Sequence, residues 1–158
     1  MTTTELTIRE FAPGDDIHFR RLNEEWITRY FVMEPKDHDA LADPQKTILS
    51  PGGRIFLAVR DGEPVGCCAL LRMGPDEFEV AKMAVTESAQ GGGIGRRLLE
   101  TVIREARAMG TTRLYLETNN KLTPAIRLYE SVGFRHLPPE RVTPSPYARS
   151  NVSMDLEL

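Results

Sequence analysis

The sequence predicts a single domain of the α/β (α+β) class, and three observations lead to this fold class. The chain has 158 residues, a usual length for one domain. Segments in which apolar and polar residues alternate, as in strands, are interspersed with segments whose apolar residues recur at helical spacing. Hydrophobic residues make up 41% of the chain, enough for a packed core and too many for a disordered chain. We therefore expect residues 1–158 to form one domain.

The expected elements follow from periodicity and from turn residues. The first half holds a strand at 5–10, a helix at 17–30 after the turn Pro13–Asp16, an irregular helix at 35–49 interrupted at Pro44, and strands at 55–60, 64–73 and 77–85. The second half holds a helix from Ile94 closed by Gly110, a strand at 113–118, a helix at 124–132 closed by Gly133, a strand from Phe134, a proline-rich loop at 138–146 and a strand at 150–157.

Charge and cysteine usage exclude several classes of protein. A net charge of −3 and a pI near 5.7 give no basic field for nucleic acid. Residues 1–11 have neither a basic nor an apolar signal region, and no apolar run is long enough to span a membrane. Cys67 and Cys68 are adjacent in an apolar segment, which favours a reduced, cytoplasmic protein. The three histidines are scattered, so we expect no metal site.

The segment Gln90–Gly95 carries the clearest functional signal. Four of its six residues are glycine, and glycine lets the backbone approach a ligand closely. The first amides of the helix that follows have no partner within that helix, and the helix dipole adds positive charge there. This combination favours a phosphate or a diphosphate, with Arg96 as a nearby cation. The spacing fits neither the dinucleotide fingerprint nor the Walker pattern, and a glycine turn without a ligand is the alternative.

Three motifs in sequence order resemble the GNAT superfamily of N-acetyltransferases. Gln90-x-x-Gly93-x-Gly95 before an amphipathic helix is similar to the acetyl-CoA motif of that superfamily. The segment 81–85 is similar to the strand that enters this motif, and 124–134 is similar to the last helix with its Tyr-to-Gly-Phe ending. The stretches 116–134 and 146–152 further resemble a bacterial branch whose domain stands alone or follows a MarR-type DNA-binding region, and we expect no such region here.

The resemblance implies a mixed, mostly antiparallel sheet of six to seven strands, flanked by about four helices and splayed between its fourth and fifth strands. It also implies that acetyl-CoA lies in this split, and no metal is implied. The backbone of Met83, Ala84 and Val85 would pair with the pantetheine arm. The diphosphate would rest on Gln90, Gly91, Gly92, Gly93, Ile94, Gly95 and Arg96. Many members have an asparagine where this chain has Leu122, so we assign the contact with the CoA arm to Asn119.

The chemistry of acetyl transfer requires a base. A primary ammonium has a pKa near 10.4, and freeing its lone pair at pH 7 costs about 4–5 kcal/mol. Glu79, on the strand that leads to the CoA site, is the candidate base, directly or through water, and Glu77 is the reserve. A solvated strand carboxylate is the alternative for either residue.

The other steps of the reaction require donors. A backbone amide near Ala84 or Val85 is the simplest donor to the oxyanion. Tyr129 fits the family position for the proton donor to the CoA thiolate, although it could also only pack its ring against CoA. An acyl-cysteine route through Cys67 or Cys68 is disfavoured, because both lie in an apolar strand with no histidine nearby in the sequence.

The acceptor is expected to be a primary amine of a small molecule or of a protein. Glu24, Trp26 and Tyr30 could form an acidic, aromatic mouth for a cation, with Tyr147 and Arg149 closing the other side. Arg149 would favour an acceptor that carries a carboxylate, and Trp26 and Tyr30 could instead be core residues. Two further alternatives are a CoA-binding sensor without turnover and a transferase of longer acyl groups. Either a monomer or a homodimer is compatible with the sequence.

Overall fold

A computed structural model describes residues 5–158; residues 1–4, the start of the segment expected to hold no signal peptide, lie outside it. The described residues form one sheet of seven strands in the order β1-β2-β3-β4-β5-β7-β6. The strands are β1 (Leu6–Glu10), β2 (Arg54–Arg60), β3 (Glu63–Arg72), β4 (Glu77–Val85), β5 (Arg113–Thr118), β6 (Arg135–His136) and β7 (Val152–Glu157). The α-helices are α1 (Asp16–Tyr30), α2 (Pro35–Ala42), α3 (Ile94–Ala108) and α4 (Thr123–Ser131).

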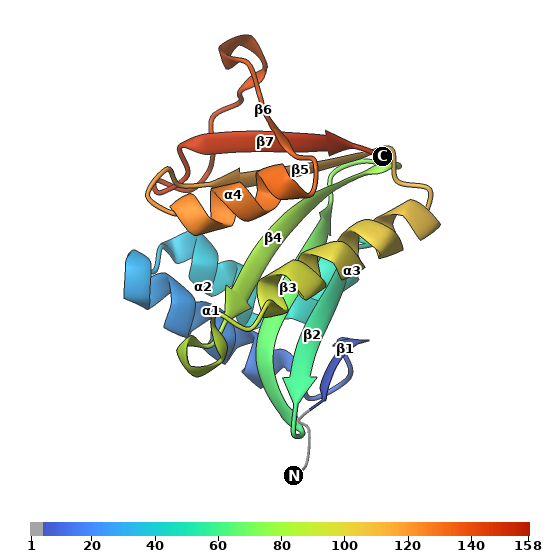
Figure 1. The fold of residues 1–158 in the computed structure, drawn as a ribbon, viewed down its shortest axis with the longest axis vertical. Helices are drawn as coiled ribbons and strands as arrows, with labels where there is room; N and C mark the ends of the chain where they lie inside the picture. The colour runs from blue at the N-terminus through green and yellow to red at the C-terminus, as the bar shows by residue number, and fades with distance from the viewer. Residues whose placement is uncertain (1–4) are drawn as a thin grey trace.

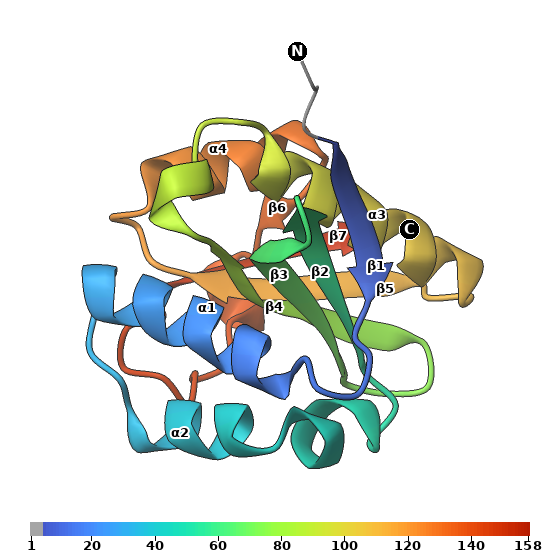
Figure 2. The same cartoon turned by 90° about the horizontal axis from the view of Figure 1, so that it is seen from below.

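The sheet lies between two layers of helices. Figure 2 shows α1 and α2 on one face and α3 and α4 on the other. Each face has its own apolar cluster. One contains Phe19, Leu22 and Leu57 on the side of α1 and α2. The other contains Leu98, Val102 and Leu114 on the side of α3 and α4. The alternation of side chains along the central strands supplies both clusters at once.

The splay expected between the fourth and fifth strands is present. β4 and β5 form the parallel pair of an otherwise antiparallel sheet, and they pair at three positions, 77 to 79 with 113 to 115. Beyond Glu79 and Tyr115 the two strands diverge, as Figure 1 shows between the green and the orange strand. The edge of β4 that faces β5 therefore has no strand partner from Val80 to Val85.

Local sequence signals set the element boundaries. Gly110 and Gly133 have φ of +81° and +109° and follow α3 and α4, as C-terminal glycines do. Asp43-Pro44 separates α2 from a short π-helical turn, η1 (Gln45–Leu49), because proline cannot continue the helix. Two short 3₁₀ turns, η2 (Glu87–Ala89) and η3 (Pro139–Arg141), complete the described elements.

Asp15, in the turn before α1, makes no side-chain cap, because its carboxylate accepts hydrogen bonds from Arg9 and from the amide of Ala12. One boundary expectation differs from the structure. The strand expected from Phe134 is only two residues long, and it is followed by the proline-rich loop.

Gly53 marks a close approach of two backbones beside β2. A Cβ added there would lie 2.6 Å from the Ile48 carbonyl oxygen and closer still to that of Leu70. We expect Gly53→Ala to lower the free energy of unfolding by about 1–3 kcal/mol, because backbone cannot move aside without strain. Urea denaturation measures this change. Gly74→Ala is the control, since a Cβ there meets nothing within 4 Å; equal stability of the two variants would contradict the packing explanation.

Within residues 5–158, no helix combines the length and the apolar character that a membrane crossing needs.

Candidate active site

A cavity of about 500 Å³ lies where β4 and β5 diverge. Its wall takes residues from α1, β4, the glycine loop, the end of β5, α4 and the segment before β7. Fifteen of the residues expected at the site line it: Trp26, Tyr30, Glu79, Met83, Ala84, Val85, Gln90, Gly91, Gly93, Ile94, Gly95, Asn119, Tyr129, Tyr147 and Arg149. The split in the sheet thus brings together segments that are far apart in the sequence.

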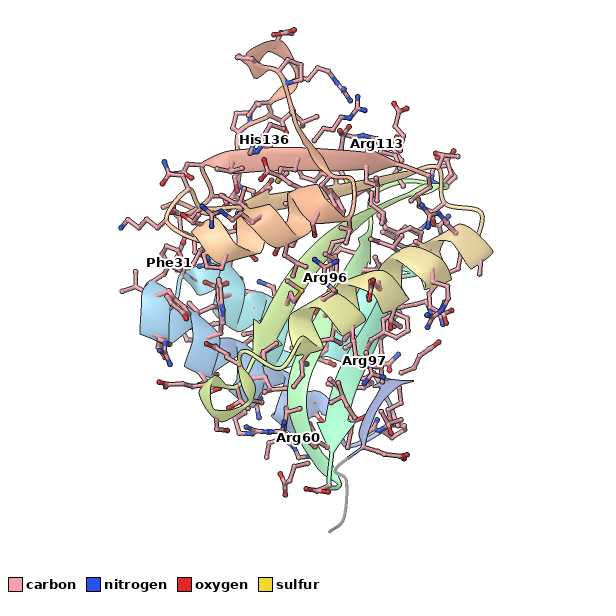
Figure 3. The ribbon with its side chains drawn as sticks, viewed as in Figure 1. Phe31, Arg60, Arg96, Arg97, Arg113 and His136 are labelled. Atoms are coloured by element: carbon pink, nitrogen blue, oxygen red, sulfur yellow. The ribbon has the colours of Figure 1, made fainter. Side chains whose placement is uncertain are left out.

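Four expected residues lie outside the cavity wall: Glu24, Glu77, Gly92 and Arg96. Glu77 forms an ion pair with Arg113 at 3.2 Å, at the closed end of the β4–β5 pair. Arg96 donates a hydrogen bond to Ser131 of α4 at 2.8 Å, and Figure 3 shows its side chain between α3 and α4. These positions leave Glu79 as the candidate base that the structure places at the cavity.

The backbone amides of residues 91–96, in the glycine loop and the first turn of α3, have no hydrogen-bond acceptor among residues 5–158. Gly91 and Gly93 have φ of +86° and +78°, values that glycine adopts without steric cost. In the described part of the chain, none of the six consecutive amides of residues 91–96 donates a hydrogen bond, and the ladder of α3 starts with Arg97 donating to Gly93. Six free amides at the N-terminus of a fifteen-residue helix form a site for an anion.

The side chain of Glu79 points to the cavity without an internal partner. None of the hydrogen bonds or ion pairs among residues 5–158 involves its carboxylate, which is half-buried. Burial, together with the nearby charge of Glu117, raises the pKa of Glu79 to about 7, and Lys82 opposes this shift. A carboxylate with a pKa near neutrality is suited to accept a proton at pH 7.

The hydroxyl of Tyr129 is also available on the cavity wall. The side chain is 9% exposed and its ring packs edge-on against Phe134 with centroids 6.1 Å apart. Burial, with a smaller contribution from Cys68, raises the pKa of Tyr129, so the phenol keeps its proton at neutral pH. No hydrogen bond of this hydroxyl occurs among the described residues. The group is therefore placed to donate to a ligand.

Glu117 is a second carboxylate on the cavity wall, and sequence reasoning missed it. It lies on β5, two residues after the last pairing with β4. Its oxygens accept hydrogen bonds from Tyr115 at 2.8 Å and from Ser145 of the proline-rich loop. These two hydroxyls fix the carboxylate, which lies close enough to Glu79 to raise its pKa. The cavity wall therefore carries two carboxylates, Glu79 and Glu117.

A largely buried group of charged side chains, Glu34, Asp37, Lys82 and Arg149, lies beside the cavity. Sequence reasoning did not predict that these side chains meet. Asp37 of α2 is 0% exposed and accepts two hydrogen bonds from Arg149, at 2.7 and 2.6 Å. Burial alone would raise the pKa of Asp37, but the hydrogen bonds from Arg149 and the charge of Lys82 lower it overall. Arg149 also pairs with Glu34 at 3.2 Å. The guanidinium of Arg149 therefore has internal carboxylate partners, and the residue also lines the cavity.

Asn119 and the cysteines have partners that bear on their expected roles. Asn119 lines the cavity, but its amide donates to the Arg149 carbonyl at 2.7 Å and accepts from the Lys121 amide at 2.8 Å. Both thiols are buried and free. Burial raises the pKa of Cys67 to about 12 and that of Cys68 further, which keeps them protonated and poorly nucleophilic. The described residues contain no cluster of His, Cys, Asp or Glu that could hold a metal ion.

Comparisons with known proteins agree with this architecture. The sequence model of the acetyltransferase (GNAT) family matches residues 19–134. A protein of Azospirillum brasilense named IAA acetyltransferase is 35% identical over 154 residues, which cover 96% of each chain. The crystal structure of a GNAT-family acetyltransferase from Staphylococcus aureus Mu50 has a TM-score of 0.87 at 21% identity, over 97% of this chain and 99% of that one. YncA of Salmonella typhimurium, solved with its cofactor acetyl-CoA, has a TM-score of 0.74 at 20% identity, over 97% and 94% of the two chains.

The family model and the relatives place the chain among enzymes that use an acyl-CoA to acylate an amine. The chain belongs to the acetyltransferase (GNAT) family. It is an acyl-CoA-dependent N-acetyltransferase, and the fold class expected from the sequence is confirmed.

Proposed function

We propose that the enzyme moves the acetyl group of acetyl-CoA onto a primary amine by direct attack within a ternary complex. The observation that carries this proposal is the run of six free amides at residues 91–96 beside a cavity that contains an unpartnered carboxylate, Glu79. Direct attack requires both substrates in one cavity. The buried, protonated thiols of Cys67 and Cys68 offer no covalent relay.

The cosubstrate would lie along the free edge of β4. The free amides of residues 91–96 would bind the diphosphate, next to Gln90 and with the positive end of the α3 dipole behind them. The backbone of Met83, Ala84 and Val85 would pair with the pantetheine arm, since this edge has no strand partner. An amide near Ala84 or Val85 would donate to the oxyanion that develops on the thioester. Acetyl-CoA supplies the activated acyl group, and these residues orient it.

Glu79 would act as the base and Tyr129 as the donor to the leaving thiolate. The pKa of Glu79 near 7 lets it accept the ammonium proton at neutral pH, directly or through water. Tyr129 retains its proton because burial raises its pKa, and a protonated phenol can donate a hydrogen bond to sulfur as the C–S bond breaks. Both groups line one cavity.

The acceptor would be a cationic amine of a small molecule or of a protein. Glu79 and Glu117 both line the cavity, and the charge of Glu117 raises the pKa of Glu79, so a positive charge near both would relieve their repulsion. Trp26 and Tyr30, with ring centroids 5.3 Å apart, form an aromatic wall on the α1 side. We further propose that the enzyme is cytoplasmic, because Cys67 and Cys68 are free thiols. Nucleic acid is not proposed as a partner.

The proposal is tested by supplying acetyl-CoA with a panel of primary amines and detecting released CoA with a thiol-reactive dye. We expect amine-dependent release and a product heavier by one acetyl group in mass spectrometry. Tyr129→Phe should slow release by about 10-fold, the equivalent of one lost hydrogen bond, while acetyl-CoA binding stays unchanged. If the protein binds acetyl-CoA but releases no CoA with any amine, it is a CoA-binding sensor and the proposal is wrong. If CoA is released faster from longer acyl-CoA thioesters than from acetyl-CoA, the acyl donor is a longer acyl-CoA.

A further inference from the structure

Lys82 has an unusual backbone conformation in the middle of β4. Its φ is +55°, and the other described non-glycine residue with positive φ is Asp61, which lies in the turn between β2 and β3. Left-handed backbone at a residue with a long side chain carries a steric cost. Such a residue persists only where its surroundings hold it in place, and it occurs at functional sites. Lys82 lines the cavity and lies directly before Met83–Val85.

Lys82 lies in a β-bulge of β4, and this bulge reverses the face of the sheet on which the side chains of the following residues lie. Cys67 and Ala69 of β3 pair with Ala84 and Ala81 of β4, so Lys82 and Met83 together oppose Cys68. One extra residue reverses the alternation of a strand. Phe78 and Val80 belong to the cluster beneath α3, yet Ala84 belongs to the cluster beneath α1. The bulge therefore decides which backbone groups of 83–85 face the split.

The ammonium of Lys82, at the far end of the side chain from β4, is clamped between Asp37 and Tyr147. It is 7% exposed, and its ammonium lies 3.3 Å from the Asp37 carboxylate, which is fully buried. The same ammonium donates to the Tyr147 hydroxyl at 3.1 Å and lies 4.7 Å from the centroid of that ring. Asp37 is itself fixed by the two hydrogen bonds from Arg149 and by the amide of Glu34 at 2.9 Å. The ammonium thus has a rigid, charged partner.

A second contact holds the backbone of the bulge at the carbonyl oxygen of Lys82. The thiol of Cys67 donates to the Lys82 carbonyl oxygen at 3.3 Å. Asn23 of α1 is 2% exposed and donates in turn to the Cys67 sulfur at 3.4 Å. Lys82 is therefore held directly by Asp37 of α2 and, through Cys67, by Asn23 of α1. An ion pair on the exposed surface would lack this burial, and it would not have its side chain and its backbone both in contact with other elements.

We propose that Asp37 is a positioning residue that, through the ammonium of Lys82, holds the β4 bulge and so aligns the backbone of Met83–Val85 with the acyl donor. This inference rests on the proposed function, because it assumes that the free edge of β4 binds the CoA arm. Asp37 is not among the residues that line the cavity. Its effect passes through the strained backbone of Lys82.

Substitutions at position 82 separate the clamp from the backbone that it holds. Lys82→Ala removes the clamp and keeps the steric cost of positive φ, so acetyl-CoA affinity should fall by about 10-fold, a factor within the range of that cost. Lys82→Gly removes the clamp and the steric cost together, and it should bind acetyl-CoA several-fold more tightly than Lys82→Ala. Asp37→Asn should weaken binding as Lys82→Ala does, and adding Lys82→Gly should restore much of the loss.

Calorimetry with acetyl-CoA measures these affinities at a temperature at which urea denaturation shows every variant to be folded. Asp39→Asn, an exposed carboxylate of the same helix, is the matched control and should bind as the unmodified protein does. Equal affinities for Lys82→Ala and Lys82→Gly, or full affinity in Asp37→Asn, would overturn the inference and leave the proposed function intact. If the unmodified protein binds no acetyl-CoA, the proposed function fails and the inference fails with it.

Discussion

Glu79→Gln is expected to lower kcat by a factor of about 10²–10⁴, the usual contribution of a general base. The substitution keeps the size of the side chain and removes its ability to accept a proton. Acetyl-CoA affinity should not change, because the proposed contacts of acetyl-CoA are with Met83–Val85 and residues 91–96, and Glu79 belongs to neither segment. The measurement is CoA release with an amine from the acceptor screen, together with calorimetry of acetyl-CoA.

The pH dependence gives a second readout of the same residue. Burial and the charge of Glu117 raise the pKa of Glu79 to about 7, and a base acts in its deprotonated form. The value of kcat/KM should therefore rise with pH up to about 7 and then level off. This rise should be absent in Glu79→Gln. Glu117→Gln should move the rise to lower pH, since it removes the charge that raises the pKa.

Glu77→Gln is the matched control for Glu79→Gln. Glu77 lies two residues earlier on the same strand, but its carboxylate pairs with Arg113 outside the cavity. We expect it to keep most of its turnover. If Glu77→Gln and Glu79→Gln lose the same fraction of kcat, or if Glu79→Gln loses none, the assignment of the base is wrong.

Replacing both Gly91 and Gly93 with alanine is expected to weaken acetyl-CoA binding by about 30-fold or more. Each residue has positive φ, and an L-residue pays roughly 1–2 kcal/mol for that conformation. The loop would relax to a shape in which its amides no longer converge on one anion. Calorimetry with acetyl-CoA gives the affinity directly.

Gly92→Ala provides the control inside the same loop. Gly92 is not among the positive-φ residues, and a Cβ there would meet its nearest atom at 3.7 Å. This variant should bind acetyl-CoA with little loss. An equal loss in Gly92→Ala and in the double variant would show that the loop tolerates no side chain at all, and the explanation from backbone conformation would then be wrong.

Local signals in the sequence account for most of the fold. The strand at 113–118 and the helix from Ile94 were predicted with their observed starts, because alternation and 3.6-residue spacing depend only on nearby residues. The splay came from the family resemblance. β6 is shorter than the strand expected from Phe134, because only Arg135 and His136 pair with β7.

The site could be predicted where one segment carries it and not where distant segments meet. The amide run of residues 91–96 lies in one continuous segment, the glycine loop and the first turn of α3, so the sequence alone favoured an anion there. Asp37 and Arg149 are 112 residues apart, and Glu117 and Ser145 are 28 apart. No periodicity relates such pairs. A lysine with positive φ also leaves no mark in the sequence, so the Lys82 bulge was missed.

The measurement that tests the central claim most directly is an amide nitrogen–proton correlation spectrum of the labelled protein, recorded as CoA is added. The claim is that free backbone donors in the glycine loop bind the diphosphate. The signals of residues 91–96 should move strongly downfield on saturation, since each amide gains a charged acceptor, and pantetheine without the diphosphate should not move them. If CoA leaves these six signals in place, whether or not others shift, the account of how this enzyme binds its cosubstrate is contradicted.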